Sequence, residues 1–310
     1  MKNLPLCCPC ELKQELLKVR SGYIKKKNDC EHSKYEGAFS EINSIPILIS
    51  EKRTDTVCNI EPGKTYIERP FSKFNKLKNL IVGESEVTKS NCLVFLDHLY
   101  KTSKNPKVLV IGGGEKGSGT SALWAAKELE IHSVDIYASD SVDIVCDGHY
   151  LPLKSNYYNG VWIQAVLEHV VEPNVVVAEI YRVMKIDGIV YAETPFMQQV
   201  HEGAYDFTRY TLLGHRYLFK KFELISLGGI KGPELVFAWS ARYFIWALTR
   251  SRGIGRISGL LIGLLMRPFS FFMSNESMYD SSSCVYFIGR KLAKHTLSHK
   301  DLIKLYKGQF

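Results

Sequence analysis

Short apolar runs alternate with helical patterns through the middle of the chain, from residue 106 to about 230. These runs predict buried strands over 107–112, 132–138, 143–148, 159–165 and 188–194. The segments 120–129 and 173–184 between them are predicted to be helices, with Thr120 or Ser121 as the cap of the first. Because parallel strands need crossover connections, this rhythm predicts a mostly parallel sheet with helices on both faces.

The flanking regions show different patterns. Residues 87–100 place apolar side chains at roughly helical spacing, and 282–292 looks like one more strand. We therefore divide the chain into an N-terminal module (1–52), a linker with a lead-in helix (53–105), a main domain (106–295) with a helical insertion (232–276), and a polar tail (296–310).

The stretch 235–273 is strongly apolar but broken. Its longest uninterrupted run, 257–266, is too short to span a bilayer. Four arginines flank or interrupt the apolar pieces: Arg250, Arg252, Arg256 and Arg267. Two interpretations stay open. The stretch is either an amphipathic surface that lies on an anionic membrane, or a helical cover packed inside the domain over a substrate pocket.

Composition narrows the partners only slightly. The 310 residues carry a formal net charge of +8, a mild excess that alone does not indicate nucleic-acid binding. The charge is compatible with an anionic substrate or an acidic membrane surface. The N-terminus shows no apolar secretion signal, so we expect a cytoplasmic protein, with membrane contact only from the inner face.

A glycine-rich loop follows the first predicted strand in "KVLVIGGGEKGSG". Gly112, Gly114 and Gly117 fit the pattern G-x-G-x-x-G between a strand and a helix. Glycines there let a ligand approach the backbone above a helix N-terminus. Asp135 ends the second strand, where a carboxylate can accept hydrogen bonds from both ribose hydroxyls. Nicotinamide cofactors and S-adenosylmethionine both use this geometry.

The residues that follow resemble the class I S-adenosylmethionine-dependent methyltransferases, in particular the group with an "LEHV" segment after the fourth strand. "VWIQAVLEHV", which contains Gln164, matches that strand and its loop, and "RVMKIDGIVYAETP" matches the turn before the fifth strand. Asp147 and Gly148 match the acid and the backbone amide that meet the adenine. Considered alone, Asp147 is also compatible with a plain surface turn.

The resemblance implies a Rossmann-like, mostly parallel seven-stranded sheet and S-adenosylmethionine as the cofactor. It implies methyl transfer, for which we expect a hydroxyl of a glycan, a lipid-linked sugar or a related metabolite as acceptor. Two alternatives remain: an oxidoreductase with a nicotinamide cofactor, and a non-catalytic partner that keeps the fold. No nucleic acid is expected as a partner.

The loop "TPFMQQVHEGAYDFTRYT" after the fifth strand is similar to a loop of methyltransferases found among cell-surface polysaccharide and lipid genes. It carries His201, Asp206 and Arg209. A hydroxyl must lose a proton when it is methylated, and an imidazole titrates near neutrality, so His201 is the candidate base. Asp206 either orients His201 or forms a structural ion pair with Arg209. Glu168 and His169 are either functional or the solvated start of a helix.

The N-terminal module concentrates cysteines. Cys7 and Cys10 have the spacing of a metal knuckle, and Cys30 and His32 follow about twenty residues later. With "SIPILIS" after it, this region resembles the small zinc-binding activators of methyltransferases. The resemblance implies a structural zinc, with His32 or Cys8 as the fourth ligand; alternatively the metal is lost and only the fold remains.

Overall fold

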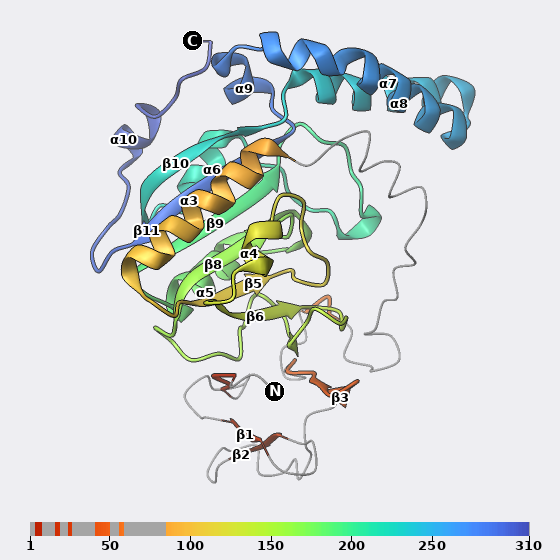
Figure 1. The fold of residues 1–310 in the computed structure, drawn as a ribbon. Helices are drawn as coiled ribbons and strands as arrows, with labels where there is room; N and C mark the ends of the chain where they lie inside the picture. Colours follow the sequence, from red (N-terminus) through yellow and green to blue (C-terminus); the bar gives the residue numbers. More distant parts are fainter. Residues whose placement is uncertain are drawn as a thin grey trace.

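The computed structural model describes residues 4–7, 16–18, 24–26, 41–49, 56–58 and 85–309. A seven-stranded sheet with the order β10-β11-β9-β8-β5-β6-β7 organises these residues (Figure 1). Its strands are β5 (Lys107–Ile111), β6 (Glu130–Asp135), β7 (Ile144–Val145), β8 (Tyr158–Gln164), β9 (Met184–Pro195), β10 (Phe222–Ile230) and β11 (Cys284–Lys291).

Five strands of the sheet are parallel. β5 pairs in parallel with both β6 and β8, and the parallel pairing continues to β7 at one edge and to β9 on the other side. β11 and β10 complete the sheet in antiparallel pairings. This confirms the predicted mostly parallel, Rossmann-like sheet. β10 was not predicted as a strand, because its half-buried pattern and paired glycines lack a clean apolar run.

Helices cover both faces of the sheet, because the parallel strands are buried on both sides. Val108 and Val110 of β5 pack in a cluster with α3 (Glu86–Thr102) and α4 (Ser121–Ala125). Leu109 and Ile111, which alternate with them, join the larger cluster around α5 (Pro173–Val183). α6 (Leu212–Leu218) packs near α5 and against β10 and β11.

The first crossover helix is shorter than its sequence pattern predicts. The prediction of 120–129 is wrong at its end, because α4 stops at Ala125 and the chain must turn before β6 begins at Glu130. Thr120 occupies the N-cap position, but its hydroxyl donates to the Gly117 carbonyl at 2.6 Å and makes no side-chain cap bond. The glycine loop therefore runs directly into a helix of little more than one turn.

Of the described N-terminal region, the segment around Ile47 and Leu48 lies along the β7 edge of the sheet, while Leu6 forms an antiparallel bridge with Leu153. Ile47 forms a parallel bridge with Val145, and the amide of Leu48 donates to the Val145 carbonyl at 2.8 Å. Two antiparallel strand pairs come before Ile47 in the chain. β1 (Leu16–Lys18) pairs with β2 (Ile24–Lys26), and β3 (Glu41–Ile42) pairs with β4 (Ile45–Pro46). "SIPILIS" thus extends the sheet of the main domain.

Of the predicted zinc ligands, the structure describes only Cys7. Its side chain is buried, and its amide donates to the Pro152 carbonyl at 2.8 Å. The other candidate ligands lie outside the described residues: Cys8, Cys10, Cys30 and His32. The zinc site therefore stays a prediction.

A helical hairpin leaves the domain between β10 and β11. It consists of α7 (Pro233–Thr249), α8 (Arg252–Met266) and η3 (Arg267–Phe272), and it extends across the top of the molecule in Figure 1. Only Ala238 and Gly255 are buried in these three helices. The stretch is therefore not packed inside the domain, and its contact with a membrane or with the acceptor stays a prediction.

The hairpin is also longer as a helix than the sequence indicated. α8 continues into η3 through Arg267, and the continuous segment Arg252–Phe272 is long and apolar enough to cross a membrane by length and composition. Short helices flank the last strand: α9 (Asn275–Ser281) before β11, and α10 (His299–Ile303) within the expected polar tail.

Candidate functional site

The glycine loop lies at the carboxyl ends of β5 and β6. Gly112 has φ of +77°, and a Cβ atom there would overlap the side chain of Val166. A Cβ atom on Gly117 would overlap the Gln164 amide. The amide of Gly112 donates to the Val134 carbonyl at 2.9 Å, which ties the loop to the end of β6. Only glycine allows this close packing, and it leaves the loop backbone near the crevice where ligands of such sheets bind.

Asp135 stands at the end of β6, as predicted. Its Oδ2 accepts a hydrogen bond from the Gly114 amide at 2.8 Å, and its Oδ1 accepts one from the Tyr137 amide at 3.1 Å. The side chain is half-buried. Because a carboxylate offers about four lone-pair positions, the acid can brace the loop and still accept bonds from a ligand.

Asp147 is buried, so the surface-turn alternative is wrong. Its Oδ1 accepts hydrogen bonds from the His149 amide at 2.9 Å and from the His149 ring at 2.6 Å, and Thr56 donates to its Oδ2. Burial alone would raise the pKa of Asp147, but these hydrogen bonds outweigh it and lower the pKa to about 2. Asp147 is therefore held ionised, with Gly148 next to it.

Gln164 braces the loop from the end of β8. Its Nε2 donates to the Ser118 carbonyl at 3.2 Å and to Glu193 Oε2 at 3.3 Å, and its Oε1 accepts from the Trp162 ring at 3.3 Å. These bonds engage the amide with the protein itself. The structure thus places Gln164 beside the predicted cofactor loop as a support.

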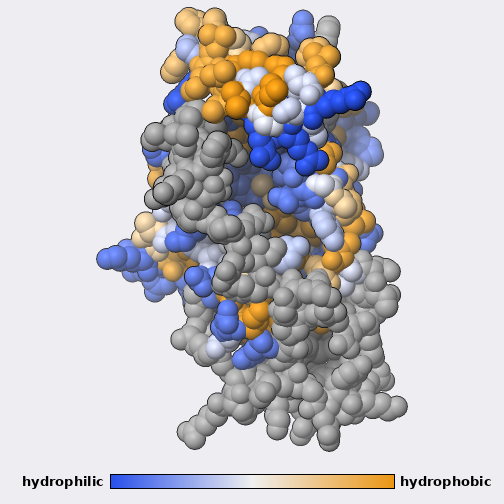
Figure 2. Space-filling model, turned by 90° about the vertical axis from the view of Figure 1, so that its right-hand side faces the viewer, coloured by the Kyte–Doolittle hydropathy of each residue, from blue (hydrophilic) through white to orange (hydrophobic). Residues whose placement is uncertain are grey.

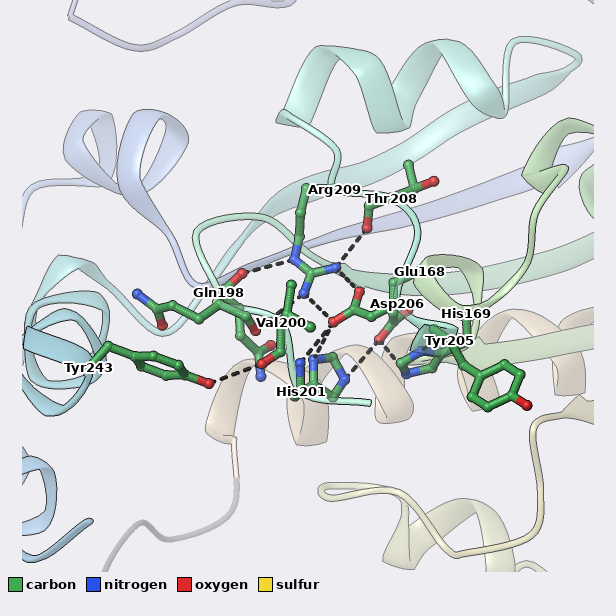
Figure 3. A network of polar contacts seen from close by, with 11 residues as sticks. Glu168, His169, Gln198, Val200, His201, Tyr205, Asp206, Thr208, Arg209 and Tyr243 are labelled. Atoms are coloured by element: carbon green, nitrogen blue, oxygen red, sulfur yellow. Dashed lines mark hydrogen bonds and ion pairs between the residues drawn. The ribbon is translucent and has the colours of Figure 1, made fainter. Parts of the chain in front are cut away.

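The loop after β9 brings together His201, Asp206 and Arg209 (Figure 3). Asp206 Oδ2 lies 2.7 Å from the Arg209 guanidinium and 3.2 Å from His201 Nδ1. Hydrogen bonds from Arg209 lower the pKa of Asp206 to about 2. Asp206 therefore does both things that the sequence left as alternatives: it orients His201 and it pairs with Arg209, which in turn donates to the Gln198 carbonyl at 2.9 Å.

Glu168 lies at the centre of the same network. It belongs to η1 (Leu167–His169), after β8, and its side chain is 0% exposed, so the interpretation as a solvated helix start is wrong for this residue. No hydrogen bond reaches either carboxylate oxygen from the described residues. Burial raises its pKa to about 8. His201 Nε2 lies 3.9 Å and His169 Nε2 3.7 Å from Glu168 Oε1.

Sequence reasoning gave Glu168 too little weight and missed Glu193 entirely. Glu193, near the end of β9, is half-buried, and it accepts hydrogen bonds from Tyr191 at 2.7 Å and Thr88 at 3.0 Å. Burial raises its pKa. The available signal was position: Glu168 follows β8 and Glu193 lies near the end of β9, at the edge of the sheet that carries the glycine loop.

Comparison with known families favours S-adenosylmethionine over a nicotinamide among the cofactors that share this geometry. Residues 109–192 match the family model described as "Methyltransferase domain". The match covers about a quarter of the chain, and this part is similar to methyltransferase domains. The match spans β5 to β9 and so includes the glycine loop, Asp135, Asp147 and Glu168, while His201 and the hairpin lie beyond it. A search of curated protein sequences found no match.

Solved structures resemble the chain at low identity, each with a TM-score below 0.5. An S-adenosylmethionine-dependent methyltransferase from Archaeoglobus fulgidus is 17% identical, with a TM-score of 0.44, over 71% of this chain and 100% of that one. Phosphoethanolamine N-methyltransferase 2 from Haemonchus contortus, in complex with S-adenosyl-L-methionine, is 18% identical, with a TM-score of 0.41, over 66% of this chain and 52% of that one. The cyclase SpnF is 14% identical, with a TM-score of 0.41, over 66% of this chain and 82% of that one. None of these likenesses identifies an acceptor.

Proposed function

We propose that the chain is an S-adenosylmethionine-dependent methyltransferase that methylates a hydroxyl group. One arrangement supports this most directly. The glycine loop and Asp135 lie at the carboxyl ends of β5 and β6, while Glu168 and His201 lie on the loops after β8 and β9, at the same edge of the sheet. A cofactor on the first pair of strands would present its methyl group toward the second pair.

The reaction needs little covalent chemistry from the protein. A lone pair of the acceptor oxygen forms the new O–CH₃ bond while the C–S bond breaks, and its electron pair returns to sulfur to give S-adenosylhomocysteine. The hydroxyl proton is released. The protein aligns the oxygen, the methyl group and the sulfur, and a group beside the hydroxyl assists the loss of the proton. We propose that His201, oriented by Asp206, provides this assistance, and that Arg209 fixes Asp206.

The hairpin favours a lipid-linked acceptor among the candidates. It exposes large apolar side chains, among them Phe271 at 88% and Phe272 at 84%. Figure 2 shows apolar residues gathered at the top of one face, where the hairpin lies. Tyr243 of α7 donates to the Val200 carbonyl at 3.0 Å, next to His201. A hairpin resting on the inner face of a membrane would therefore hold the acceptor loop close to lipid headgroups.

A ligand titration tests the cofactor assignment. We expect S-adenosylhomocysteine to bind at micromolar concentration and NADH not to bind. Asp135→Ala removes a charge-assisted acceptor and should weaken S-adenosylhomocysteine binding about tenfold or more, equivalent to about 1.5–3 kcal/mol. Binding of NADH would support the oxidoreductase alternative, and binding of neither would support a non-catalytic partner. Wild-type affinity in the variant would contradict the role of Asp135.

We also propose that the N-terminal module holds one structural zinc ion through Cys7, Cys10, Cys30 and His32. Such a module has little core of its own, so the metal would stabilise its fold. Metal analysis of protein never exposed to chelator should find the zinc, and Cys10→Ser should lower its content. A zinc-free preparation would remove this proposal and leave the methyltransferase proposal intact.

A further inference from the structure

We propose that Glu168, His169 and His201 form a binding site for one divalent transition-metal ion, such as Zn²⁺. One candidate ligand atom from each residue lies within 4.8 Å of the other two. The residues come from two separate loops, after β8 and after β9, that meet at the carboxyl edge of the sheet. This site is distinct from the predicted cysteine site of the N-terminal module, which shares none of these residues.

Glu168 supplies the first argument. Its side chain is completely buried, and neither of its oxygens receives a hydrogen bond from the described residues. A buried carboxyl group that lacks a hydrogen bond is costly, and proteins tolerate one chiefly where another charged group completes the site. The backbone around it is well anchored, because the Phe207 amide donates to the Glu168 carbonyl at 2.7 Å. The lack of a hydrogen bond to the Glu168 side chain is therefore not the result of a loosely held loop.

The two histidines supply the second argument. His169 Nδ1 lies 2.6 Å from the Tyr205 carbonyl oxygen, and His201 Nδ1 lies 3.2 Å from Asp206 Oδ2. Both partners accept hydrogen bonds only, so each Nδ1 must carry the proton. In the neutral rings, the lone pair is then on Nε2, and both Nε2 atoms face Glu168 (Figure 3). A carbonyl or carboxylate that fixes the far nitrogen is how metal-binding histidines are usually oriented.

The distances fit a small adjustment on binding. Zinc takes nitrogen and oxygen ligands at about 2.0–2.2 Å, which places tetrahedral ligand atoms roughly 3.4 Å apart. The carboxylate-to-ring distances are 3.7 and 3.9 Å. The side chains of His169 and His201 are 23% and 30% exposed, while that of Glu168 is 0% exposed. Solvent therefore reaches the site from the side of the two histidines. Two imidazoles and one carboxylate with an open position are a typical ligand set for catalytic zinc.

The inference deepens the proposed function, although binding of the ion does not depend on it. A cation at this site would hold the acceptor oxygen at its open position and lower the pKa of the hydroxyl, so that the oxygen attacks the methyl group as an alkoxide. His201 would then assist the loss of the proton through the ion. Without the ion, the imidazole would have to accept the proton itself.

The test compares metal binding in full-length protein that has been treated with chelator. In a calorimetric titration with ZnCl₂, the wild type should bind one ion more than Glu168→Gln, and also one more than His201→Gln. His299→Ala, which removes an exposed imidazole on α10, should match the wild type. Cys10→Ser should lose a different ion and keep the one bound at Glu168. Equal stoichiometry in the wild type and both site variants would overturn the proposal.

A second measurement keeps the test decisive if a variant is unstable. CoCl₂ reports its ligands through visible absorption, so the wild type should show a band of a site with nitrogen and oxygen ligands that Glu168→Gln and His201→Gln lack. ZnCl₂ should also raise the melting temperature of Cys10→Ser, and it should not raise that of Cys10→Ser combined with Glu168→Gln. A band and a melting shift that survive the site substitutions would overturn the proposal. No measurement involves S-adenosylmethionine, so the cofactor assignment can fail independently.

Discussion

Glu168 and the hairpin α7–α8 both place side chains in surroundings of the opposite polarity. Glu168 is a carboxylate in the protein interior without a hydrogen bond from the described residues. The hairpin presents a row of apolar side chains to solvent, on α8 at Ile254, Ile257, Leu261, Leu264 and Leu265. Each mismatch costs free energy in the isolated chain, and each would be relieved by one of the proposed partners: a cation for the first and a lipid surface for the second.

The two regions also differ in how they are held. The loops after β8 and β9, which carry Glu168 and His201, are fixed by many hydrogen bonds, among them those of Arg209 and Asp206. The hairpin contacts the loop after β9 through α7, where Gln199 donates to Ser240 at 3.3 Å and Tyr243 donates to the Val200 carbonyl at 3.0 Å. A catalytic group must be placed within fractions of an ångström, while a membrane contact needs only exposed area. Precise placement at one site and exposed area at the other therefore follow from their proposed functions.

The largest effect, on the turnover rate, should come from a substitution of His201. His201→Ala should lower the turnover rate about 10²–10⁴-fold while cofactor affinity stays nearly unchanged, because the imidazole acts only on the acceptor proton, directly or through an ion. The measurement is steady-state kinetics with the true acceptor, together with a titration of S-adenosylhomocysteine. A loss of cofactor affinity with little change in turnover would instead mean that His201 only packs the loop.

The apolar row of α8 should give the next largest effect. Replacement of Ile257, Leu261 and Leu265 with serine should lower partitioning onto anionic vesicles about 100-fold, since each apolar side chain contributes about 1 kcal/mol or more when it leaves water. Ile303→Ser, at an equally exposed position on α10, is the matched control and should bind like the wild type. Flotation with vesicles measures both.

The same experiment separates a surface contact from a membrane span. A peripheral hairpin should be released from membranes by alkaline carbonate. Protein that stays in the membrane after this wash would show that Arg252–Phe272 crosses the bilayer, which its length and composition allow.

The sequence predicted the regular part of this molecule well, for a physical reason. The parallel strands are apolar on both faces, so the residues of β5 mark a buried strand without any knowledge of their neighbours. β10 was missed because it is half-buried and contains Gly228 and Gly229. The glycine loop and Asp135 were placed correctly, since their spacing is fixed by one strand, one turn and the next strand.

The site around Glu168 and His201 was predicted only in part, because its residues meet through tertiary structure. Glu168 and His201 are 33 positions apart, and nothing local in the sequence shows that their side chains face each other. Likewise, a row of apolar residues on α8 has the same periodicity whether it faces a core or solvent. Burial of the whole hairpin is a property of the packed molecule, so the sequence could not decide between a cover and an exposed surface.

The pH dependence of the free energy of unfolding should report on His215, a buried group that has a hydrogen-bond partner. His215 is buried, with Nε2 3.1 Å from the Thr194 hydroxyl, and burial lowers its pKa from 6.5 to about 3. The unfolded chain therefore binds a proton below pH 6.5 that the folded chain refuses, so stability is lost as pH falls from 6.5 toward 3. The loss should be about 2 kcal/mol at pH 5 relative to pH 7.

His215→Phe should remove this part of the pH dependence in urea unfolding, whatever its effect on stability at pH 7. His299→Ala, on the exposed surface, should leave the wild-type dependence in place. An unchanged pH dependence in His215→Phe would show that the ring is solvated and titrates normally in the folded chain.

The smallest effect concerns the charges that accompany the apolar row. Arg252, Arg256 and Arg267 are spaced by four and eleven residues, which places them on one side of the helix, away from the row that contains Ile257 and Leu261. Glu234 is the one acidic residue in 233–272, which contains five arginines, so the hairpin carries a positive net charge. Arg252→Gln with Arg256→Gln should weaken binding to anionic vesicles by about 1 kcal/mol per arginine, or roughly fivefold each. The variant should bind neutral vesicles like the wild type, and the difference should shrink at high salt, because screening weakens surface charges. Lys300→Gln on α10 removes a charge outside the hairpin and should change neither measurement. An equal loss on neutral vesicles would mean that the arginines act by holding the hairpin together, as the position of Arg252 over the Trp246 ring, 5.2 Å from its centroid, would allow.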